Sequence, residues 1–141
     1  MSYASNTARY VDNEVLSRSP EWLVPLMYEH LIGSLRRAIV QTEMADLGGR
    51  SKSLDKADGI VAELLCTLDR DNGGELADSL ASLYAYFAVE VLNARFSKEV
   101  GTLPKLVALL EELHGAWITA AEQVAPRSGG NRQTASATVA A

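Results

Sequence analysis

The chain has 141 residues, of which 48% are hydrophobic, 22% are charged and 6% are aromatic. This length favours one domain with a hydrophobic core of its own. The formal net charge of −5 argues against a nucleic-acid-binding protein, because no dense lysine and arginine face is present to replace the counterions of phosphates.

The N-terminal residues 1–18 precede the first predicted helix. The sequence MSYASNTARYVDNEV lacks the apolar stretch of a secretory signal. It nevertheless includes Tyr3, Tyr10, Val15 and Leu16, which is too apolar for an arm that is fully solvated. We therefore expect residues 1–18 to form an N-terminal arm that docks partly onto the rest of the molecule.

The first predicted helix begins at the end of the sequence SRSPE, residues 17–21. Pro20 suits the first helical position, and Glu21 suits the positive end of the helix dipole. Pro25 lies past the predicted first turn and is expected to kink the start of the helix. The helix is expected to end near the sequence DLGGR, where Gly48 and Gly49 could supply a left-handed C-cap.

Three further helices follow, each with apolar residues spaced by threes and fours. They are predicted at Ser53 to Arg70, Glu75 to Phe96 and Thr102 to about Val124. Beyond Pro126 the sequence RSGGNRQTASATVAA has no periodicity and is expected to be disordered. The sequence thus predicts an all-α fold: an antiparallel four-helix bundle over residues 19–125, with a disordered tail over residues 126–141.

Two features bear on the compartment. No apolar run approaches the roughly 20 residues that a membrane span needs. The single cysteine, Cys66, lies in the apolar sequence ELLCTL and is expected to be a small core residue, as a reducing compartment would allow. We therefore expect a cytoplasmic protein that does not insert into membranes.

The sequence LDRDNGG suggests a calcium loop, but its spacing is wrong. Counted from Asp69, an EF-hand needs an oxygen ligand at position five and a bidentate glutamate at position twelve. Gly73 and Leu80 stand at these positions. A turn between two helices is the better interpretation, with Glu75 and Asp78 near the positive end of the second helix.

Other chemical motifs are incomplete. The sequence Glu111-x-x-His114 matches one half of a di-iron site, but Met27 stands where the glutamate paired with His30 would be. His30 in the sequence HLIGS suggests a phosphotransfer bundle, although the lysine expected beside such a histidine is absent. We expect no metal, no cofactor and no enzymatic activity, and a phosphotransfer signalling bundle remains the alternative class.

The third predicted helix has more apolar surface than a core stripe of about 100° requires. The arc expected to face the core contains Leu76, Leu80, Leu83, Tyr84, Phe87 and Val91. An adjacent arc contains Ala77, Ala81, Ala85 and Ala88. These alanines either flank the core or form a smooth face on which another helix can dock. A third possibility is that the alanine face pairs with a second copy, giving a homodimer.

The order of these segments resembles the flagellar export chaperone family, FliS, over about residues 8–120. The matching features are Tyr10, the first-helix sequence SPEWLVPLMYEHLIGSLRRA, the second-helix sequence KADGIVAELLCTLD, the third-helix sequence GGELADSLASLYAYFAVEVLNA, and Trp117 near the end of the fourth helix. Pro25 departs from the family pattern, which has an apolar residue there.

The resemblance implies a cytoplasmic chaperone that binds the disordered C-terminal region of flagellin, prevents premature polymerisation and presents flagellin to the flagellar type III export apparatus. It also implies that the N-terminal segment can occupy part of the flagellin groove. We expect Tyr10 and Leu16 to act as this displaceable plug. The expected groove contacts are Ala77, Leu80, Ala81, Tyr84, Ala85 and Ala88, with Leu64 and Leu68 opposite them.

Overall fold

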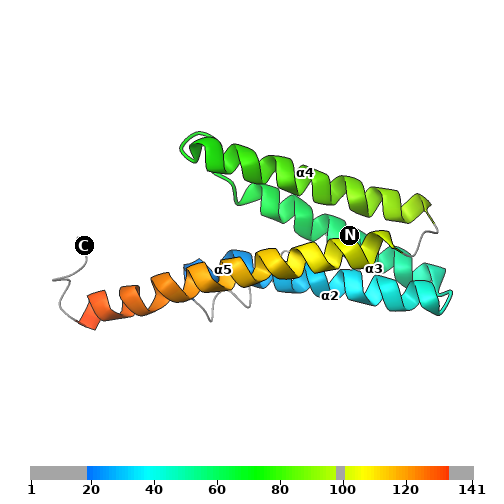
Figure 1. The fold of residues 1–141 in the computed structure, drawn as a ribbon, viewed down its shortest axis with the longest axis horizontal. Helices are drawn as coiled ribbons and strands as arrows, with labels where there is room; N and C mark the ends of the chain where they lie inside the picture. The colour runs from blue at the N-terminus through cyan, green and yellow to red at the C-terminus, as the bar shows by residue number, and fades with distance from the viewer. Residues whose placement is uncertain (1–18, 98–100, 134–141) are drawn as a thin grey trace.

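The computed structural model describes residues 19–97 and 101–133, and the secondary structure of this part of the chain consists of helices joined by turns, as predicted. Four long helices form a bundle in which successive helices run in opposite directions (Figure 1). The elements are a short 3-10 helix η1 (Pro20–Trp22), α2 (Leu23–Glu43), α3 (Leu47–Cys66), α4 (Gly74–Phe96) and α5 (Thr102–Gln133). Within the described ranges, no helix is both long and apolar enough to cross a membrane.

The helix α2 is central to the packing, because it has the most extensive contacts, with α3 on one side and α5 on the other. The helix α4 lies at the edge of the bundle and packs on α3 and, less extensively, on α5 (Figure 1). Apolar side chains from all four helices form the core; the largest fully buried ones include Tyr28, Leu31, Leu35, Leu54, Ile60, Leu64, Tyr84, Phe87 and Leu110.

The start of α2 accommodates Pro25 without loss of a hydrogen bond. The helix begins at Leu23, so Pro25 is its third residue. The first four N–H groups of a helix have no partner within the helix, and a proline among them removes nothing. The irregularity expected at Pro25 instead lies ahead of it, in the 3-10 turn of η1.

The connection between α2 and α3 differs from the prediction. Ala45, not a glycine, adopts the left-handed conformation, with φ of 57°. Asp46 then caps α3 by accepting a hydrogen bond from the Gly49 N–H at 2.9 Å. A Cβ at position 49 would collide with the Asp46 carboxylate. The predicted C-cap at Gly48 and Gly49 is therefore wrong: these glycines belong to the first turn of α3.

The helix α3 ends at Cys66, four residues before the predicted end at Arg70. The turn that follows is held by Asp69, whose two carboxylate oxygens accept hydrogen bonds from the backbone N–H and the side-chain amide of Asn72, each at 3.1 Å. Gly74 completes the reversal with φ of +57°. The acidic sequence thus forms the predicted turn.

Cys66 is exposed, so the prediction that it is a core residue is wrong. Leu64 is fully buried, and two residues rotate a helix by about 200°. Cys66 therefore points to the opposite side of α3.

The helix α5 continues to Gln133, past the boundary at Pro126 where the sequence predicts a disordered tail. Proline removes one backbone hydrogen bond, but its fixed φ is close to the helical value, so a helix can continue through it. Residues 134–141, the remainder of the predicted tail, lie outside the described residues, as does the predicted arm, residues 1–18.

Polar contacts fasten α3 and α4 together at one end of the bundle. The Arg95 guanidinium pairs with Asp55 at 2.7 Å and with Asp58 at 2.6 Å. Arg50 of α3 donates a hydrogen bond to the carbonyl of Ala94. These contacts tie the end of α4 to the part of α3 between Arg50 and Asp58, whereas the opposite end of the bundle contains a cavity.

Candidate partner-binding groove

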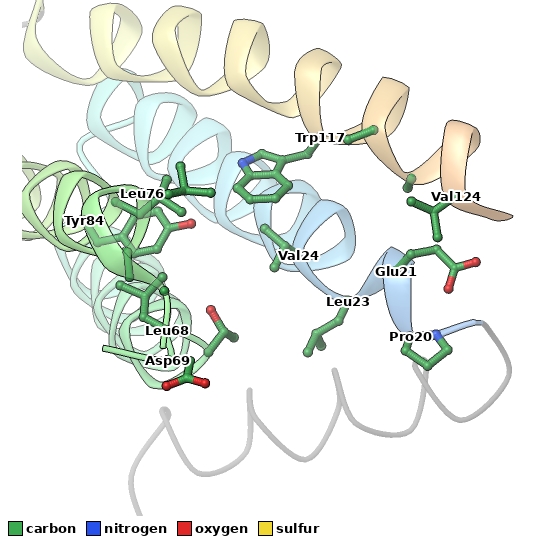
Figure 2. Close-up of a pocket in the computed structure, with 16 residues that line it drawn as sticks. Pro20, Glu21, Leu23, Val24, Leu68, Asp69, Leu76, Tyr84, Trp117 and Val124 are labelled. Carbon is green, nitrogen blue, oxygen red and sulfur yellow. The ribbon is translucent and has the colours of Figure 1, made fainter. Parts of the chain in front are cut away.

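A cavity of about 480 Å³ opens at the end of the bundle where α2 and α4 begin and α3 ends. We call it the groove. Figure 2 shows side chains from the start of α2, from the turn after α3, from α4 and from the second half of α5 around it. Its apolar lining includes Leu23, Val24, Leu68, Leu76, Leu80 and Trp117. The groove thus offers apolar surface from elements that are far apart in the sequence.

Aromatic rings form one side of the groove. Tyr84 and Trp117 line it, and the fully buried ring of Tyr28 lies behind them. The Tyr28 ring centroid is 6.4 Å from that of Tyr84 and 6.1 Å from that of Trp117. Burial raises the pKa of the Tyr28 and Tyr84 phenols, so both rings are neutral at physiological pH. Rigid aromatic surface of this kind is typical of binding sites for apolar partners.

The ionisable groups of the groove lining, apart from Tyr84, are Glu21 and Asp69. The hydrogen bonds from Asn72 hold the pKa of Asp69 below its usual value. Glu21 differs from Asp69, because its Oε1 atom is shielded from solvent and has no hydrogen-bond partner. The lining that the structure describes is therefore apolar, with two carboxyl groups among its side chains.

A second apolar surface runs along the outward side of α4. It comprises Ala85, Val89, Leu92 and Phe96, and we call it the outer stripe. Val89 and Leu92 are each 51% exposed, and Phe96 is 84% exposed. At about 100° per residue these positions share an arc of about 60°. The helix α4 is therefore apolar both toward the core and toward the solvent.

Comparison with known protein families identifies the family. The sequence model of the family described as flagellar protein FliS matches residues 2–124. The chain belongs to the FliS family.

Several curated relatives support the FliS assignment. The flagellar secretion chaperone FliS of Salmonella typhimurium is 29% identical over 119 residues, which cover 84% of this chain and 85% of the relative. The protein of the same name from Escherichia coli is 29% identical, with coverage of 76% and 79%, and that from Bacillus subtilis is 27% identical, with coverage of 77% and 80%. The family is one of secretion chaperones, a role that is not enzymatic.

In this FliS-family chain, the groove brings together four of the predicted contact residues. These are Leu68, Ala77, Leu80 and Tyr84. Leu64 is a correction to the prediction, because it is fully buried in the core and has no surface to offer a partner. Tyr10 and Leu16, the predicted plug, lie outside the described residues.

The predicted alanine face is divided between different environments. Ala77 is buried and lines the groove, whereas Ala81 is partly buried outside the groove lining. Ala88 is partly buried against the core, and Ala85 is exposed on the outer stripe. The four alanines therefore do not form a single docking face, because α3 and α5 cover the two sides of α4 to different extents.

Two walls of the groove were not predicted from the sequence. One is the start of α2, with Pro20, Glu21, Leu23 and Val24; the other is the second half of α5, with Trp117, Ala120, Ala121 and Val124. Leu76 was expected in the core, but it is 69% exposed and lines the groove. The outer stripe could have been found, because its residues are spaced by four, three and four.

The buried hydroxyl of Tyr28 makes a stability prediction possible. No hydrogen bond of normal geometry reaches this oxygen, although the side chains of Tyr84 and Trp117 lie near it, and a buried polar group without a partner costs about 1–3 kcal/mol. Tyr28→Phe should therefore raise the free energy of unfolding by about 1 kcal/mol, as measured by urea denaturation. A loss of stability would show that the hydroxyl is hydrogen bonded in solution.

Proposed function

We propose that this FliS-family chain is a cytoplasmic export chaperone that binds the disordered C-terminal region of flagellin. Binding prevents premature polymerisation, and the complex is delivered to the flagellar type III export apparatus. The observation that carries the proposal is the open apolar groove, whose walls come from α2, α4, α5 and the turn after α3. The names of the relatives, flagellar secretion chaperones, support it.

The shape of the apolar surface favours a long, flexible partner over a compact one. An amphipathic helix is the kind of ligand that places its apolar side in such a groove. The outer stripe lies on the opposite side of α4 from the core and could hold a second segment of the same partner. A disordered chain can wrap both surfaces, and the entropy that it loses on ordering keeps its release possible.

The family assignment favours this function over the phosphotransfer alternative. His30 is partly buried on α2, and it is not among the residues that line the groove. A phosphotransfer protein would present its histidine to a partner enzyme. The groove instead presents leucines, alanines and aromatic rings, which suit a hydrophobic partner.

Calorimetric titration tests the proposal directly. The full chain is titrated with a C-terminal segment of flagellin from the same bacterium, and the N-terminal segment of that flagellin serves as the control. We expect the C-terminal segment to bind and the N-terminal segment not to bind. Binding should show a negative heat-capacity change from apolar burial, and the helical signal in circular dichroism should increase on mixing. If the C-terminal segment does not bind, the proposed function is wrong.

A further inference from the structure

The groove contains a carboxylate whose environment is incomplete. Glu21 lines the groove, its Oε1 atom is shielded from solvent, and no donor bonds to that oxygen. The other carboxylate, Asp69, already accepts two hydrogen bonds from Asn72. Figure 2 places Glu21 beside Val124 and Asp69 beside Leu68, on different sides of the groove.

The groove lining does not supply the missing cation. No lysine or arginine of the described chain is among the residues that line it. Some described carboxylates elsewhere have cationic partners: Asp55 and Asp58 pair with Arg95, Asp78 pairs with Arg70, and Glu111 pairs with Arg36. Glu21 is therefore unusual in combining a shielded oxygen with the lack of a partner.

A carboxylate oxygen held away from water without a donor is unfavourable. The cost is removed when a binding partner brings a cation or an N–H group to it, and charge-assisted hydrogen bonds are about twice as strong as neutral ones. Such incomplete groups are rare in folded proteins and each calls for a physical explanation. A partner that completes the Glu21 site would gain both affinity and a fixed register.

We infer that the groove receives an amphipathic helix that presents a lysine or arginine to Glu21 while its apolar side packs against Leu76 and Trp117. The inference rests on the proposed function and specifies the chemistry of the partner: an apolar face with a cation at its edge. Charge complementarity carries it, since the described lining offers the carboxyl groups of Glu21 and Asp69 and no lysine or arginine. Asp69 contributes less, because it is solvent-exposed and its oxygens are already hydrogen bonded.

The first test measures the contribution of Glu21 to flagellin binding. Glu21→Gln keeps the shape and removes the charge, and we expect it to weaken binding of the flagellin C-terminal segment about tenfold. Glu43→Gln is the matched control, because Glu43 is exposed at the far end of α2 and should leave the affinity unchanged. If the wild type binds the segment and the Glu21→Gln variant binds it equally tightly, the inference is wrong and the proposed function stands.

A second test does not depend on flagellin. Two synthetic amphipathic leucine–alanine helices are compared, one with a lysine at the edge of its apolar face and one with norleucine there. The wild-type chain should prefer the lysine peptide about tenfold, and Glu21→Gln should lose this preference. Equal affinity of the wild type for the two peptides would overturn the inference, even if the flagellin segment does not bind.

Other occupants give different results. If residues 1–18, which include Arg9 and Arg18, already neutralise Glu21, then Glu21→Gln should strengthen binding of the flagellin segment by releasing them. If a second copy of the chain fills the groove, sedimentation should show a dimer that Glu21→Lys dissociates. Either result would overturn the assignment of the cation to a partner helix.

Discussion

Leu76→Glu should weaken binding of the flagellin C-terminal segment on the order of 100-fold and leave the fold intact. Leu76 lines the groove and is 69% exposed in the free protein, so a partner helix would bury it. The change removes about 2 kcal/mol of apolar burial and adds a charge that the partner must desolvate, for a total of about 3 kcal/mol. Calorimetric titration measures the loss.

The stability of the Leu76→Glu variant should be close to that of the wild type. Leu76 is the third residue of α4, where a carboxylate interacts favourably with the helix dipole. Leu47→Glu is a matched control, because Leu47 is the first residue of α3, is 74% exposed and is not among the residues that line the groove. If both variants bind as tightly as the wild type, flagellin does not use the groove.

Phe87→Ala should lower the free energy of unfolding by about 3–5 kcal/mol, because it leaves a cavity in a well-packed core. The Phe87 ring is fully buried. It lies nearly perpendicular to the ring of Tyr28, with centroids 6.4 Å apart, and its centroid is 5.8 Å from that of Tyr84. Chemical denaturation followed by circular dichroism measures the change.

Phe96→Ala provides the comparison, since it makes the same chemical change on the same helix. Phe96 is 84% exposed on the outer stripe, and its loss should change stability by less than about 0.5 kcal/mol. Similar destabilisation by the two substitutions would mean that α4 does not present these two faces as described. If Phe96→Ala weakens binding of the flagellin segment and Phe87→Ala does not, the outer stripe is a second contact.

The fold was predictable because helical periodicity, capping residues and glycine turns agreed with one another. The third predicted helix, Glu75 to Phe96, matches α4 within one residue. The errors occurred where alternative caps compete: Asp46 begins α3 at glycines that could equally have ended α2. The end of α5 was missed because a proline permits a helix to continue when it removes only one hydrogen bond.

The groove was less predictable, because it depends on the angles between helices. Two of the α4 residues expected as contacts, Leu80 and Tyr84, line the groove, although their use by a partner remains a prediction. Helical periodicity does not show that α2 and α5 supply the other walls. It also does not show that Leu76 is exposed whereas Leu64 is buried in the core. The environment of Glu21 is a property of the assembled groove. Its position in the sequence indicates only an acidic residue in the first turn of a helix, where it suits the positive end of the helix dipole.

The exposed position of Cys66 has a practical consequence. It is the single cysteine of the chain, and the next two residues, Thr67 and Leu68, both line the groove. A fluorophore attached to this thiol would lie on the outer side of α3, next in the chain to the groove lining, without any other substitution in the protein. Its emission would report the arrival and departure of a partner in real time, which gives the rate of cargo release that equilibrium titration does not provide.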